Sequence, residues 1–201
     1  MPNFSADDVI VGEGNLLYAP LATALPDETS VGYGDYDSWT GWTHFGYTTE
    51  PITFNYAYDE FSVEVQQSLA PLKRRKTNES MTIATTLAQF SGDVLALVTG
   101  GTNTDTASGS GQKGFSRVVG GGTTNISEYM VAVEGYRVDS TGVQQPVRVF
   151  LYKATITASG DIPFDRAGVT GLPITITGLT DPDRAVGENL FEAQIVTAAA
   201  S

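Results

Sequence analysis

The chain has 201 residues and no cysteine, and its 11 Lys plus Arg against 23 Asp plus Glu give a net charge of −12. The lack of cysteine excludes disulfide frameworks, thiol catalysis and cysteine-type zinc sites. The acidic balance argues against sequence-specific nucleic-acid binding, which needs a basic surface to neutralise phosphates.

The first fifty residues predict an arm, a short strand and a surface loop. Residues 1–14 carry acids where a secretory signal has a basic region and then an apolar one, so no such signal is expected. NLLYAPL, which begins at Asn15, is a candidate strand that ends at Pro20. Residues 26–50 are rich in Gly, Asp, Tyr and Trp, which predicts turns around aromatic anchors.

Three segments in the middle of the chain alternate apolar and polar residues with the period of two that half-buried strands show. They are ITFNYAY (52–58), EFSVEVQQS (60–68) and SMTIATTLA (80–88). The residues that alternate with the large apolar ones are Glu60, Ser62, Glu64 and Gln66 in the second segment and Thr82, Ala84 and Thr86 in the third.

Four consecutive bases, Lys73, Arg74, Arg75 and Lys76, lie in the predicted loop 69–79 between two of these strands. Four of the 11 basic residues are therefore concentrated in one short segment. A solvated turn explains them most simply, and a nuclear-localisation signal fits their composition. A third interpretation is a contact between subunits, in which the basic loop reaches the acidic surface of another copy.

One short helix is predicted at residues 91–99. Ser91 is a good N-cap, Asp93 lies in the first turn, and Gly100 ends the helix. Residues 101–124 are rich in Gly, Ser and Thr and predict a long loop. Further strands are expected at 126–138, 146–158, 172–179 and 190–196, so the fold class is mostly β, with about eight strands and one flanking helix.

Motifs for catalysis or metal binding are weak. GSGQKG (109–114) matches a dinucleotide-binding pattern but lies in the Gly/Ser loop, without the strand and helix that such a site needs. His44 is the only histidine, and the Asp pairs in DYDS and DPDR do not continue as calcium loops. We therefore expect no enzyme activity, no cofactor and no metal.

Several segments together resemble one known family. GEGNLLYAPLATALPDE (12–28) is followed by the paired strands EFSVEVQQS and MTIATTLAQ, by the short helix GDVLALVTGG, and by a late ATITASGDIPF and GLPITITGL. In this order the chain, over residues 9–196, is similar to the major tail (tail tube) proteins of long-tailed bacteriophages.

The resemblance implies a single tail-tube-like domain over residues 1–201, folded as a β-sandwich or half-barrel beside a helix. It further implies that six copies close into a ring, and that rings stack into a hollow tube in the virion tail. The implied partners are the tape-measure protein and passing DNA in the lumen, tail-terminator and baseplate proteins at the ends, and no membrane. Assembly would take place in the cytoplasm of the bacterial host.

Electrostatics suggests which residues face the lumen. Lys or Arg contacts hold phosphate by counterion release, so a lumen of carboxylates and small polar groups lets DNA slide. The candidate lumen residues are Glu60, Ser62, Glu64, Gln66, Thr82 and Thr86, unless this face simply meets bulk solvent. The candidate contacts between subunits are Leu72 and the four bases, and the arm 1–14 and the loops 69–79 and 101–124 are candidate assembly elements.

A binding module is the alternative function. It would be a β-sandwich decoration, receptor-binding or adhesin protein of a virion, with Trp39, Trp42, Phe45 and Tyr47 as its ligand surface.

Overall fold

The computed structural model describes residues 9–10, 12–122, 124–164, 166 and 168–197. Over these residues the chain is mostly β, as predicted, with ten strands where about eight were expected. The strands are β1 (Asn15–Ala19), β2 (Thr43–His44), β3 (Thr53–Val63), β4 (Lys73–Leu87), β5 (Thr102–Thr106), β6 (Phe115–Val119), β7 (Glu128–Val138), β8 (Gln144–Ala158), β9 (Leu172–Gly178) and β10 (Phe191–Ile195). The helices are α1 (Gly92–Thr99) and the short 3-10 helix η2 (Tyr36–Ser38).

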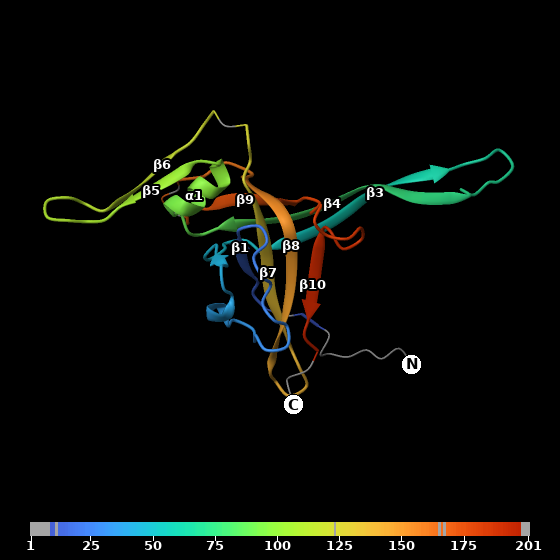
Figure 1. The fold of residues 1–201 in the computed structure, drawn as a ribbon, viewed down its shortest axis with the longest axis horizontal. Coiled ribbons are helices and arrows are strands. Elements are labelled where there is room, and N and C mark those ends of the chain that lie inside the picture. The colour runs from blue at the N-terminus through green and yellow to red at the C-terminus, as the bar shows by residue number, and fades with distance from the viewer. Residues whose placement is uncertain (1–8, 11, 123, 165, 167, 198–201) are drawn as a thin grey trace.

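The main sheet is open rather than a closed barrel, and its strands pair in the order β2-β1-β7-β8-β9-β4-β3. The long strand β8 has β7 along one edge, while its other edge pairs with β10 at residues 147–151 and with β9 at residues 154–158. Opposite Met130, β8 carries two residues, Tyr152 and Lys153. Such a bulge bends a strand and increases its twist, so the β9-β4-β3 part turns away from the β10 part (Figure 1).

The larger core lies on the face of the main sheet that α1 covers, here called the helix-covered face. Val94 and Val98 of α1 pack in the same apolar cluster as Leu151, Ile156 and Ile174 of the sheet. The predicted boundaries of the helix are confirmed. The Ser91 side chain accepts a hydrogen bond from the Val94 amide at 3.2 Å, and Gly100 ends the helix at φ 67°. A glycine tolerates this left-handed conformation without steric cost.

The opposite face is covered in part by the chain between residues 25 and 42. Trp39 and Trp42 lie against Phe150, with ring centroids 5.9 and 5.8 Å apart, and the Trp42 indole nitrogen donates to the Ala24 carbonyl. The prediction of a loop built around aromatic anchors is therefore confirmed. Trp39 is only 3% exposed, so these rings form a second, smaller core.

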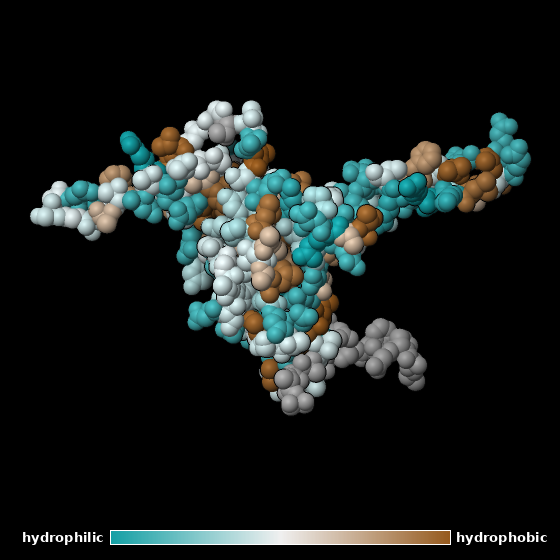
Figure 2. Space-filling view, viewed as in Figure 1, coloured by the Kyte–Doolittle hydropathy of each residue, from teal (hydrophilic) through white to brown (hydrophobic). Residues whose placement is uncertain are grey.

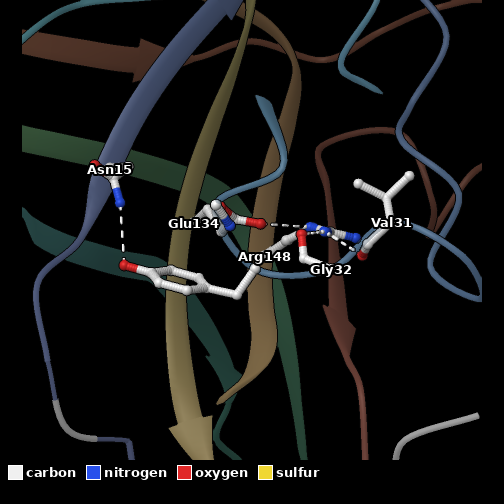
Figure 3. Close-up of polar contacts among 7 residues, drawn as sticks. Asn15, Val31, Gly32, Glu134 and Arg148 are labelled. Carbon is white, nitrogen blue, oxygen red and sulfur yellow. Dashed lines mark hydrogen bonds and ion pairs between the residues drawn. The ribbon is translucent and has the colours of Figure 1, made fainter. Parts of the chain in front are cut away.

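A buried ion pair fixes this covering segment to the sheet (Figure 3). Arg148 of β8 and Glu134 of β7 both have fully buried side chains, and Arg148 Nε lies 3.0 Å from Glu134 Oε1. The same guanidinium donates to the carbonyls of Val31 and Gly32 at 2.7 and 3.2 Å. The Gly34 amide donates back to Glu134. Both charges are thereby compensated, and the loop is bound to two central strands.

Loss of one partner of this ion pair should be far more harmful than loss of both. Arg148→Met leaves a buried carboxylate without its partner, so we expect the free energy of unfolding to fall by about 3–5 kcal/mol. The double variant Arg148→Met with Glu134→Leu should recover most of that loss. Denaturant titration followed by tryptophan fluorescence measures both changes.

A matched control is Lys153→Met, which breaks the more exposed ion pair with Glu128. That change should cost about 1 kcal/mol or less. Equal losses for Arg148→Met and Lys153→Met would contradict the role assigned to the buried pair.

Two hairpins project from the body in opposite directions, β3–β4 on one side and β5–β6 on the other (Figure 1). The strands predicted at 52–58 and 60–68 are one strand, β3, which ends at Val63, and the predicted loop 69–79 is strand from residue 73 onward. The four bases therefore lie in a strand rather than a loop. The predicted loop 101–124 also contains paired strands, β5 and β6. Of the N-terminal segment 1–14, which was predicted to be an assembly arm, residues 1–8 and 11 lie outside the described residues.

Candidate assembly surfaces

The outer part of the β3–β4 hairpin, residues 56–81 and here called the arm, pairs with no third strand. β9 pairs with β4 only from Thr82 to Leu87, so residues 73–81 of β4 have β3 as their sole partner strand. At ~3.3 Å per residue this part reaches roughly 30 Å beyond the sheet. An isolated two-stranded hairpin is marginally stable in water, so a contact that covers the arm would stabilise it.

Apolar side chains are exposed along the arm and its turn (Figure 2). They are Tyr58, Phe61, Val63, Leu69 and Leu72. Water contact with so many large apolar groups on one projection is typical of an interaction surface.

The strand register divides the four bases between the two faces of the arm. Residue Thr77 has no partner in β3, because Asp59 pairs with Asn78 while Glu60 pairs with Lys76. Beyond this bulge, Arg74 lies opposite Ser62 and shares a face with Lys76. Arg75 lies opposite Phe61 and Lys73 opposite Val63, on the other face.

Lys76 and Arg74 have acidic partners within the arm. The Lys76 ammonium lies 2.9 Å from Glu79 Oε1 and 2.8 Å from the Tyr56 hydroxyl, and 4.5 Å from the centre of the Tyr58 ring. Arg74 lies 3.4 Å from Glu60. These two charges hold the strands of the arm together and are balanced locally.

Lys73 and Arg75 differ from their neighbours, since neither has an ion-pair partner among the described residues. Their side of the arm also carries the exposed Phe61 and Val63. The combination of two free cations and two apolar groups, here called the contact face of the arm, suits a surface that is both apolar and acidic.

The titration of Glu79 tests the geometry of the balanced face. A hydrogen bond from the Tyr56 hydroxyl at 2.6 Å, followed by the contact with Lys76, lowers the pKa of Glu79 below its ordinary 4.5. The stabilisation is complete above the ordinary value and is lost as the pH falls through the lowered value. Tyr56→Phe should raise the pKa of Glu79, as measured by NMR titration of its carboxyl carbon.

Tyr58→Phe is the matched control, because it removes one hydroxyl from the neighbouring tyrosine, which makes no hydrogen bond to Glu79 in the described structure. An equal rise in both variants would contradict the assigned hydrogen bond.

Small side chains, all polar except that of Ala84, occupy the part of the opposite face that residues 25–42 leave uncovered. One cross-strand row runs Thr155, Thr177, Thr82 and Asn55, and the next runs Thr157, Thr175, Ala84 and Thr53. The flanking charges of Glu128 and Lys153 neutralise each other in an ion pair of 2.8 Å. These two rows, here called the threonine face, form an uncharged hydrophilic surface across β8, β9, β4 and β3.

The predicted lumen residues do not form one surface. Thr82 belongs to the threonine face, whereas Glu60 and Ser62 lie on the other side of the hairpin, the side that carries Met81. Glu64 and Gln66 follow the end of β3 and lie in the turn of the arm. Sequence alternation missed this division, because the apolar positions of β3 switch from even residues, ending at Tyr58, to odd residues, beginning at Phe61, so its polar residues do not stay on one face.

The remaining candidate motifs take structural positions. GSGQKG lies at the turn of the β5–β6 hairpin, where Gly109 bridges to Gln112. The Gly46 amide donates to His44 Nδ1, so His44 Nε2 carries the proton and faces Asn15. Over the described residues, no group of three His, Asp or Glu side chains is placed to hold a metal, and no helix is long and apolar enough to cross a membrane.

Most of the aromatic residues that a binding module, the alternative function, would use as its ligand surface are not freely exposed. Trp39 and Phe45 are 3% and 1% exposed. Of the four aromatic residues, only Tyr47 is a large exposed group. A binding module would therefore have to use other residues.

Comparison with known proteins decides the family. The sequence model of the family described as phage tail tube protein matches residues 2–199, which is nearly the whole chain. The chain belongs to the phage tail tube protein family. It is therefore a structural protein of the virion tail, built into a tube with copies of itself. None of the curated proteins matches the chain.

Among solved structures, the chain is similar to one described as the crystal structure of Hcp protein. The sequence identity is 12% and the TM-score 0.33, and the alignment covers 92% of this chain and 100% of that one.

Proposed function

We propose that this tail tube protein forms hexameric rings that stack around a lumen, which holds the tape-measure protein and later passes DNA. Membership of the tail tube family is the observation that carries the proposal. Rings need contacts that close by rotation, and stacking needs a second set of contacts along the axis. Tail-terminator and baseplate proteins would meet the two ends of the tube, and assembly would take place in the bacterial cytoplasm.

The arm is proposed as the contact between successive rings. It projects from the body, exposes apolar groups and carries two unbalanced cations in a chain of net charge −12. Each exposed ion pair contributes only ~0.2–1 kcal/mol. Six copies in each ring junction multiply that contribution, and screening reduces it above ~0.1 M salt. Leu72 lies beside the bases as an apolar anchor.

Reversal of the free cations tests the arm. Lys73→Glu with Arg75→Glu should give folded subunits, with unchanged circular dichroism, that polymerise poorly in sedimentation and electron microscopy. High salt should weaken polymerisation of the parent in the same direction. The control pair Arg74→Gln with Lys76→Gln alters the balanced face and should affect polymerisation less. Normal tubes from the Lys73 and Arg75 variant would reduce the arm to a solvated projection.

The lumen is proposed to be lined by the threonine face. Hydroxyl groups hydrate well and carry no charge that binds phosphate, so DNA passes without repeated release of counterions. Thr82 and Thr86 of the predicted lumen set lie on this side of the sheet, while Glu60 and Ser62 lie on the other.

New cations in the lumen should slow the passage of DNA. Thr82→Lys with Thr177→Lys places two amines on the threonine face, and we expect slower DNA release from particles triggered in vitro, with a delay that shrinks at high salt. Glu64→Lys with Gln66→Lys places two amines in the turn of the arm, while also removing one carboxylate, and should leave the release rate unchanged. The reverse pattern would assign the lumen to the acidic residues of the arm instead.

A further inference from the structure

A groove on the helix-covered face of the sheet is not filled by the described chain. It has a volume of about 560 Å³, and its floor is formed by Val133, Val147 and Val149. All three valines are half-buried rather than buried, so water reaches their methyl groups. Glu13 and Glu50, both exposed, lie on its walls. The groove is therefore apolar at its base and acidic at its rim.

Gly135 shows that the space above the floor is open. It lies inside β7, opposite Val147, where a larger residue would normally pack. A Cβ atom added to it would meet no other atom within 4 Å, and its φ is not among the positive values that favour glycine. Neither the backbone nor the local packing requires glycine here. Glycine within a strand often marks a place where another chain approaches closely.

The contact face of the arm has the complementary chemistry. Phe61 and Val63 are exposed and apolar, and Lys73 and Arg75 beside them are free cations. The arm runs away from the body that carries the groove (Figure 1), so it cannot fold back onto its own groove without breaking β3 or β4. The other hairpin, β5–β6, exposes Phe115 and Val119 but places only one base, Arg117, between them. The arm supplies two cations for the two acids.

We propose that the groove receives the arm of a second copy of this chain. Phe61 and Val63 lie over the valine floor, and Lys73 and Arg75 face Glu13 and Glu50. This inference rests on the proposed function, because it names the surface that the arm meets in the assembled tube. It also accounts for the open space above Gly135, which leaves room for an aromatic side chain from another subunit.

Filling the groove is the first test. Gly135→Leu places a side chain in open space, so the subunit should fold with the unfolding midpoint of the parent. Its critical concentration for polymerisation should rise at least tenfold. Gly32→Leu adds the same side chain at an exposed position outside the groove, where a Cβ also has open space, and should leave polymerisation unchanged. A folded Gly135→Leu variant that polymerises like the parent would overturn the proposal.

Complementary charge reversal is the second test. One variant carries Lys73→Glu and Arg75→Glu, and the other carries Glu13→Lys and Glu50→Lys. Each alone opposes like charges and should polymerise poorly. An equimolar mixture restores opposite charges at every junction between unlike subunits, so it should form tubes near the critical concentration of the parent. Asp183→Lys with Glu188→Lys is the control, since both acids are exposed and neither lines the groove.

The remaining outcomes identify other occupants. If the mixture stays unpolymerised but Arg117→Glu restores the Glu13 and Glu50 variant, the β5–β6 hairpin fills the groove and the proposal is overturned. If deletion of residues 2–8 reproduces the Gly135→Leu defect and the mixture fails, the N-terminal segment fills it, which also overturns the proposal. Failure of the parent chain itself to form tubes would instead count against the proposed function.

Discussion

The edge of β8 that faces away from β7 pairs with two strands in succession, and this shared edge determines the shape of the molecule. β10 takes residues 147–151 and β9 takes residues 154–158, with the bulge at Tyr152 and Lys153 between them. Because β10 and β9 pair with β8 on opposite sides of the bulge, they lead in different directions. β10 stays with the body, while β9 brings β4 and β3 to the side. The arm leaves the body where β9 ends, because only β3 continues beside β4.

The same division gives the two faces of the sheet different uses. The helix-covered face is buried beside α1 but open around Gly135 and Val147. The opposite face is covered by aromatic residues around Phe150 and bare at the threonine face. A subunit that completed its own core on both faces would have little surface left for neighbours. Here the chain covers each face at one end of the sheet and leaves the other end exposed.

The sequence predicted the regular elements well where their side chains meet a core. Helix α1 was located by Ser91 and Gly100, and β7, β8 and β9 by their apolar runs. The arm was mistaken for a loop because Lys73 to Lys76 pack against no core. The segment therefore lacks the alternation of apolar and polar residues that indicates a strand. The family was recognisable from the order of the segments, and the family model agrees.

The candidate surfaces were harder to predict, for reasons of register. The bases were identified, but which two of them share a face with Glu60 and which two share a face with Phe61 depends on Thr77 being unpaired. The threonines of β8 and β9 were not considered for the lumen, because only pairing shows that they continue the rows of Thr82. The Arg148–Glu134 ion pair could not be predicted, because the sequence shows only two isolated charges in two apolar strands and not that they lie side by side.

The bulge at Thr77 affects the direction of the arm rather than the faces of its bases. Because Thr77 is the unpaired residue, its deletion would leave Lys76 opposite Glu60 and Arg75 opposite Phe61, so each base would keep its face. A bulge bends a strand and increases its twist. The deletion would therefore straighten the hairpin and displace its far end, without touching the body or any base. Two subunits that differed by this one residue would share a fold and a set of surface groups but carry those groups to different places.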